Sequence, residues 1–119
     1  MTIDRAPAHL SDMLAFTREL RALLQNQSLA QYKSDRVLNL AVEKLFINLG
    51  EAAQRLSEPE RAQIAGVPWR QIIGLRNILA HGYEQVDHET LFRTVTADLG
   101  GVETTLRAAL ERVGGSGSP

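Results

Sequence analysis

The chain has 119 residues, of which 44% are hydrophobic and 23% charged, and its formal net charge is −1 with no cysteine. One globular domain fits this length, the charge argues against a protein that coats nucleic acid nonspecifically, and the lack of cysteine excludes disulfides, thiolate metal sites and cysteine nucleophiles. No apolar run approaches the roughly 20 residues of a membrane span, and Met1–Pro7 lacks signal-peptide features, so we expect a cytoplasmic protein with no membrane partner.

The first half of the chain carries two amphipathic patterns. Apolar side chains recur at spacings of three and four over residues 10–24, which predicts a first helix. Ser34 or Asp35 can cap a second helix that runs to Leu56. Its apolar positions are Val37, Leu38, Leu40, Ala41, Val42, Leu45, Phe46, Ile47, Leu49, Ala52 and Leu56. They occupy more than one face, and such a helix usually contacts both the core and another partner.

The second half predicts three further helices. Residues 57–60 predict the end of the second helix, and a short helix through Ile64 is expected to follow them. The next helix begins at Pro68 and is ended by Gly82. Asp87 can cap a last long helix to Val113, which two adjacent glycines, Gly100 and Gly101, should weaken.

These elements predict an all-α fold. No stretch alternates with period two, so we expect no sheet. Four main helices with short connections favour an up-and-down four-helix bundle with an additional short helix. We assign residues 1–113 to this single domain and residues 114–119, all Gly, Ser and Pro, to a flexible tail.

Four polar side chains lie among strongly apolar neighbours between Ile73 and Tyr83. Asn77 and His81 are four residues apart and share a helical face, and Arg76 and Tyr83 are seven apart and also align. The four residues form one polar strip if helical geometry persists to Gly82. The alternative interpretation is structural: the arginine forms an ordinary salt bridge, and the histidine interacts with the end of the helix.

The strip contains what cleavage of RNA without a metal requires. A histidine can move a proton near neutral pH, and an arginine can hold a phosphate and stabilise the charge of its transition state. The asparagine can orient either group. Glu84 and Asp87 alone do not make a convincing ligand set, so we predict no metal and no cofactor.

Two segments carry a resemblance to a known family. Residues 68–83, Pro-Trp-Arg-Gln-Ile-Ile-Gly-Leu-Arg-Asn-Ile-Leu-Ala-His-Gly-Tyr, resemble the signature stretch of the HepT family in the HEPN superfamily. Residues 48–57 are similar to its Gly-Glu-Ala-Ala helix, and Val86-Asp87 to its usual continuation. The likeness extends loosely over residues 11–113.

The resemblance implies a fold, an activity and a partner. HEPN proteins of this type are helical bundles that form homodimers, with two Arg-x4–6-His motifs facing a shared cleft. Many are metal-independent ribonucleases, and HepT proteins are toxins. Their antitoxin is a minimal nucleotidyltransferase, which transfers AMP to the tyrosine two residues after the motif histidine. That tyrosine is Tyr83 here.

The family's roles carry over to three further residues. Arg76 would bind and polarise the scissile phosphate of an RNA, with transfer RNA one candidate substrate. His81 would be the general base or acid around the attacking 2′-hydroxyl, and Asn77 would support that geometry.

Two classes of function stay open. The first is an endoribonuclease toxin, and the second is a non-catalytic helical module that docks a nucleotidyltransferase and is modified by it. The presence of Arg76, His81 and Tyr83 favours the first, whereas the mild acidity favours the second. Toxicity on expression alone separates them.

Other polar and aromatic residues receive simpler interpretations. Arg5, Arg18 and Arg21 form a solvated face, with RNA contact the minority interpretation. Trp69 is expected in the core. His9 and His88 are expected at exposed helix starts, and Glu51 on the surface or at a dimer or cleft contact.

Overall fold

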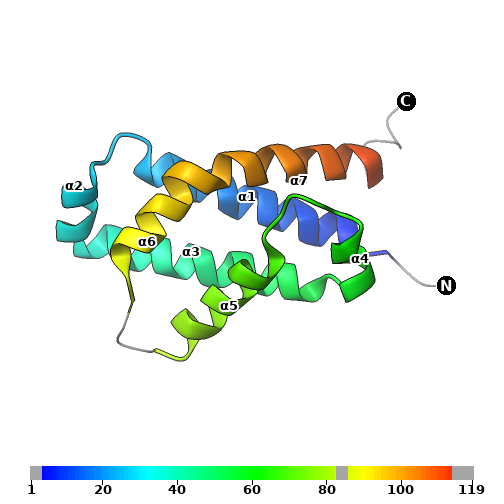
Figure 1. The fold of residues 1–119 in the computed structure, drawn as a ribbon, viewed down its shortest axis with the longest axis horizontal. Coiled ribbons are helices and arrows are strands. Elements are labelled where there is room, and N and C mark those ends of the chain that lie inside the picture. The colour runs from blue at the N-terminus through cyan, green and yellow to red at the C-terminus, as the bar shows by residue number, and fades with distance from the viewer. Residues whose placement is uncertain (1–3, 83–85, 114–119) are drawn as a thin grey trace.

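Residues 4–82 and 86–113 are described by a computed structural model (Figure 1). Every regular element in these residues is a helix, which confirms the all-α class. In chain order the elements are α1 (Ala6–Leu24), α2 (Leu29–Ser34), α3 (Arg36–Arg55), α4 (Glu58–Ala62), α5 (Trp69–Ala80), α6 (His88–Arg93), the π-helix η1 (Thr94–Asp98) and α7 (Leu99–Val113). No described helix is long and apolar enough to span a bilayer. The predicted tail, residues 114–119, lies outside the described residues.

Side-chain caps begin the helices where the sequence places them. Asp35 accepts a hydrogen bond of 3.0 Å from the backbone N–H of Leu38, so it caps α3 as one of the two predicted candidates. Ser57 caps α4, which ends at Ala62, two residues before the predicted end. Each cap satisfies an N–H that the first helical turn leaves without a partner.

The short helix α2 was not predicted. Ser28 and Gln31 form a reciprocal capping box, in which the Ser28 hydroxyl accepts from the Gln31 N–H and the Gln31 side chain accepts from the Ser28 N–H. Tyr32 of this helix is fully buried, and burial raises the pKa of its phenol to about 12. The helix therefore closes one end of the core (Figure 1).

The predicted last helix is helical throughout but not uniform. Asp87 caps α6 as expected, and the chain then widens into the π-helix η1 before α7. This irregularity precedes Gly100 and Gly101, which are both helical within α7. His88, expected to be exposed, is only half-exposed, and its ring meets that of Tyr32 edge-on at 5.8 Å between centroids.

The long helices pack side by side around one core. α1 contacts both α3 and α7, and α3 contacts α5 (Figure 1). The largest fully buried side chains are Tyr32, Phe46, Leu10, Met13, Leu20, Leu24, Leu49, Leu56, Leu91, Leu99, Leu106 and Val42. On α3 only part of the apolar surface faces this core, because Val37 is 78% and Leu40 48% exposed.

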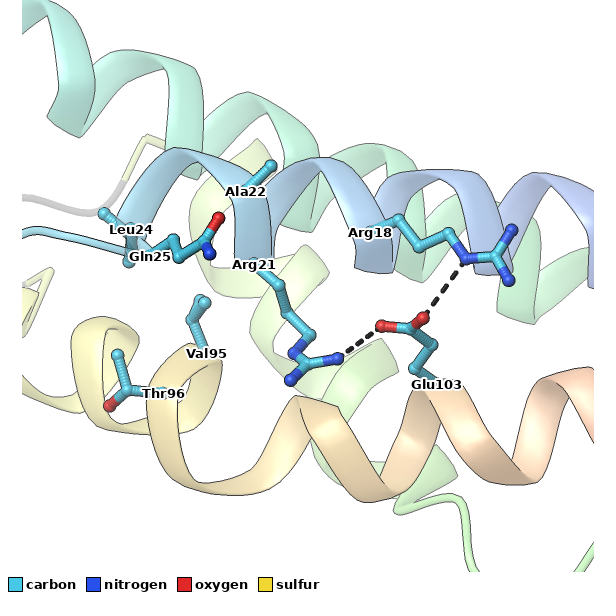
Figure 2. A pocket seen from close by; sticks show the side chains of 8 residues that line it. All are labelled: Arg18, Arg21, Ala22, Leu24, Gln25, Val95, Thr96 and Glu103. Atoms are coloured by element: carbon cyan, nitrogen blue, oxygen red, sulfur yellow. Dashed lines mark hydrogen bonds and ion pairs between the residues drawn. The ribbon is translucent and has the colours of Figure 1, made fainter.

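An acidic residue of α7 joins that helix to α1. Glu103 accepts hydrogen bonds from Arg21 at 2.5 Å and from Arg18 at 3.2 Å, beside a hollow of about 480 Å³ (Figure 2). The bond from Arg21, with a second from Arg18, holds the pKa of Glu103 below its usual range. One carboxylate balances one of the two positive charges, and Arg18 and Arg21 stay 52% and 47% exposed, as expected of a solvated face.

α5 approaches α3 at a glycine. A Cβ placed on Gly50 would lie 2.2 Å from the Cβ of Arg76 and 3.1 Å from the carbonyl oxygen of Ile72. Real side chains do not approach so closely, so the helices can meet here only because residue 50 has no Cβ. The contact brings the motif helix onto the core.

Gly50→Ala should lower the free energy of unfolding by about 1–3 kcal/mol, because the added methyl group overpacks the α3–α5 contact. Gly74→Ala is the matched control: Gly74 lies inside α5, and a Cβ there meets nothing within 4 Å. That variant should gain about 0.5–1 kcal/mol from helix propensity. Urea denaturation followed by circular dichroism measures both, and equal effects of the two changes would contradict this packing.

Glu103→Gln should lower the Tm at pH 7, because it removes the charged acceptor of both α1 arginines. A carboxyl pKa that is lowered in the fold contributes stability above the unfolded value, and that stability is lost as the pH falls through the folded pKa. The Tm difference between variant and parent should therefore shrink on acidification to about pH 3. Melting curves across this range test it, and a difference that is independent of pH would show that the charge does not matter.

Candidate functional site

The start of α5 is fixed by local contacts. The Trp69 indole N–H donates to the carbonyl of Ile64 at 3.1 Å, and the ring packs partly buried against the core. The expectation that Trp69 packs into the core is met in part. Ile72 and Leu79 form the buried face of the helix. The polar residues of the motif are therefore left to the flanks of α5.

The end of α5 retains the predicted alignment. The helix ends at Ala80, and His81 is its C-cap residue, with a backbone N–H that donates to the carbonyl of Asn77 at 3.2 Å. This bond preserves helical spacing between Asn77 and His81. Gly82 then adopts a φ of +69°, which favours glycine, and directs the chain away from the helix axis.

Arg76 is half-buried between α5 and α3. Its Nη1 donates to the side-chain oxygen of the adjacent Asn77 at 3.1 Å, and its Nη2 lies 3.4 Å from a carboxylate oxygen of Glu51. Its Nε is buried and has no hydrogen-bond partner among the described residues. The structure thus brings Arg76, Asn77 and Glu51 together, as a hydrogen-bonded group on the surface of two helices.

Of the other residues of the predicted strip, the structure describes His81, which is exposed at the end of α5. Tyr83, the fourth residue of the strip, and Glu84, weighed above as a metal ligand, lie outside the described residues. Glu51, which the sequence left open as a surface, dimer or cleft residue, joins the site as a partner of Arg76 from 25 positions away.

Asp87, considered above as a metal ligand, has a structural task. Its carboxylate accepts from the backbone N–H groups of Glu89 and Thr90, and from the Thr90 hydroxyl at 2.7 Å. These hydrogen bonds, the hydroxyl first, hold the pKa of Asp87 below its usual range. In residues 4–82 and 86–113, no three His, Asp or Glu side chains gather as metal ligands.

A groove runs along the other flank of α5. It has a volume of about 1090 Å³ and lies between α5 and the continuous helical stretch formed by α6, η1 and α7. Gly74, Leu75 and Ile78 line its α5 side, and Ile78 is 44% exposed. None of Arg76, Asn77 and His81 lines it, so the polar group and the groove are separate features of one helix.

Comparison with known proteins identifies relatives over most of the chain. Residues 13–113 match the family model described as ribonuclease HepT-like. A protein of Methanocaldococcus jannaschii named as an RNase is 27% identical over 92 residues, covering 77% of this chain and 84% of that protein. A Caldanaerobacter subterraneus protein also named as an RNase is 27% identical over 85 residues, covering 71% of this chain and 76% of its own.

A third relative carries the family name itself. A Thermococcus cleftensis protein named as a ribonuclease HepT is 27% identical over 84 residues, which cover 71% of this chain and 70% of that protein. No solved structure matches the chain.

Proposed function

The chain belongs to the HepT-like ribonuclease family, and from that premise we propose that it is an endoribonuclease toxin that cleaves RNA without a metal ion. The observation that carries the proposal is the arrangement at the end of α5. Arg76 is held by hydrogen bonds, and the exposed His81 follows one helical turn after Asn77. A cation held in place on α5 and an imidazole exposed at the C-cap of the same helix are suitable groups for metal-free cleavage of a phosphodiester.

The proposed reaction is a transesterification within the RNA. The 2′-hydroxyl oxygen attacks the neighbouring phosphorus, its proton passes to a base, and the bond from phosphorus to the 5′-oxygen breaks as that oxygen takes up a proton. The products are a 2′,3′-cyclic phosphate and a 5′-hydroxyl. His81 carries one of these protons, Arg76 balances the charge that develops on the phosphate oxygens, and Asn77 orients Arg76.

We further propose that the active form is a homodimer of HEPN-type four-helix bundles. One chain offers a single motif histidine, whereas the reaction moves two protons, so a cleft shared by two copies of α5 would supply a base and an acid. Exposed apolar residues support an interface next to the motif, because Ile78 on α5 and Leu40 on α3 are 44% and 48% exposed. RNA is the substrate class, with transfer RNA one candidate.

Regulation is proposed to act through Tyr83. A partner nucleotidyltransferase would transfer AMP from ATP: the Tyr83 hydroxyl oxygen bonds to the α-phosphorus, pyrophosphate leaves, and the phenolic proton is released. The added group is bulky and carries a negative charge, so it would exclude RNA phosphates near Arg76 by volume and by repulsion. The family's tyrosine position after the motif histidine supports this assignment. We place both proteins in the cytoplasm.

Arg76→Ala and His81→Ala should each abolish toxicity and RNA cleavage while the fold persists. Loss of a general acid or base lowers rates by about 10²–10⁴-fold, and loss of a transition-state donor by about 10²–10³-fold. Cleavage by the parent should survive EDTA and leave 2′,3′-cyclic ends, read by mass spectrometry of an RNA oligonucleotide. Light scattering of the same samples should give the mass of two chains.

Arg70→Ala is a suitable control, because Arg70 is an exposed arginine of the same helix. Its activity should match that of the parent. Cleavage that stops in EDTA and returns with magnesium would refute the metal-free mechanism. A parent that binds the nucleotidyltransferase but is neither toxic nor able to cut RNA would instead support the docking module.

Tyr83→Phe should fold normally and escape the antitoxin, because it lacks the hydroxyl that accepts AMP. The parent, incubated with the partner and ATP, should gain the mass of one or more AMP units on the peptide that contains Tyr83. Intact-mass and peptide analysis measure the gain, with RNA cleavage assayed alongside. Complete inhibition without any mass gain would show that the antitoxin acts by binding alone.

A further inference from the structure

Glu51 is a charged residue that the proposed mechanism does not use. It follows Gly50 on α3 and forms an ion pair with α5, with 3.4 Å between its carboxylate oxygen and Nη2 of Arg76. Gly50 leaves room for the Cβ and Cγ of Arg76 to lie against α3, and Glu51 contacts the guanidinium of the same side chain. The two neighbours on α3 thus contact both ends of one side chain on α5.

The contact is too exposed and too long to be explained by stability. Its side chains are 38% and 26% exposed for Glu51 and Arg76. Exposed ion pairs of this kind contribute little to folding. Glu103 provides a comparison within the same chain: it is only 17% exposed and accepts from two arginines, at 2.5 and 3.2 Å. The arginines bound to Glu103 are 52% and 47% exposed, so exposure does not separate the two contacts. At 3.4 Å the Glu51 contact is the longer one and stabilises the fold less, so its main effect is another one.

That effect is the direction of the Arg76 guanidinium. An arginine side chain has many rotamers, and the contact with Gly50 restricts only its stem. Glu51 and Asn77 each accept a hydrogen bond from a different Nη atom, so together they fix the plane of the guanidinium. Each Nη carries two hydrogens, which leaves one N–H on each for an anionic ligand.

We propose that Glu51 is a positioning residue that orients Arg76 toward the substrate phosphate. The inference rests on the proposed ribonuclease function and adds a residue of α3 to a site otherwise built from α5. Because a misplacement of about 1 Å can cost about 10²-fold in rate, a weak contact that sets direction can matter greatly for turnover. Glu51 orients through its oxygen atom as an acceptor and transfers no proton.

The test compares Glu51→Ala with Glu51→Gln in steady-state cleavage of an RNA oligonucleotide that the parent cuts. Glu51→Ala should lower kcat by about 10–100-fold with little change in KM, because the guanidinium loses its direction. Glu51→Gln keeps an acceptor oxygen and should restore kcat to within about threefold of the parent, with the same pH profile. Glu89→Gln removes a carboxylate paired with Arg93 at 2.6 Å on α6 and should leave cleavage unchanged.

Three results would overturn the proposal. If Glu51→Gln is as slow as Glu51→Ala and the acidic limb of the pH profile is lost, Glu51 transfers a proton. If both variants bind RNA more tightly and cleave faster, Glu51 masks Arg76 rather than orienting it. If neither variant differs from the parent, the contact has no part in turnover.

A second measurement does not depend on cleavage. The Nε of Arg76 is buried, so its N–H should exchange slowly with water and give a resolved signal in ¹H–¹⁵N NMR spectra, assigned by its loss in Arg76→Lys. Glu51→Ala should speed this exchange or broaden the signal, whereas Glu89→Gln should not. If the parent cuts no RNA, the proposed function fails. If the Nε signal of Arg76 and the rate of RNA cleavage are both unchanged in Glu51→Ala, the positioning role of Glu51 is wrong, while the proposed ribonuclease function stands.

Discussion

The approach of α5 to α3 depends on a glycine, because residue 50 of α3 has no side chain. At Gly50 a Cβ would meet the Arg76 Cβ at 2.2 Å, and packed interiors cannot absorb such a clash without moving a helix. Because the helices close at this point, Ile72 and Leu79 reach the core and the arginine stem crosses the α3 backbone. The same contact therefore secures the motif helix and decides where its cation lies.

Local signals in the sequence predicted the elements that they govern, and one such signal was overlooked. Asp35 and Asp87 could be predicted as helix caps because a cap depends only on the few residues that follow it. The spacing of Ser28 and Gln31 is that of a capping box, but it was overlooked because Ser28 ends a stretch of polar residues. The π-helix left no such signal, because Leu91, Val95 and Leu99 are spaced by four just as Val102, Leu106 and Leu110 are in the regular helix α7.

The candidate site could be predicted only as far as it is local. Asn77 and His81 align because one helix sets their spacing, and the structure keeps that alignment through a backbone bond. Glu51 was expected on the surface or at a dimer or cleft contact, but it was not predicted as the partner of Arg76. Glu51 is 25 residues away, and a contact of that kind depends on how two helices meet rather than on either pattern alone. The exposure of Leu40 was unpredictable for the same reason, because several faces of α3 are apolar.

Under the proposed function, the two key side chains at the end of α5 differ in their exposure to solvent. Arg76 is half-buried, its stem lies on Gly50, and hydrogen bonds hold its head group. A charge that stabilises a transition state acts best when it is already oriented, since no reorganisation is then needed during the reaction. His81 is exposed at the C-cap, beyond the last helical residue. A proton carrier needs that access, because it must be reset by solvent or product after each turnover. The end of one helix can serve both needs, since side chains within its last turns are restrained by packing while the cap residue already faces solvent.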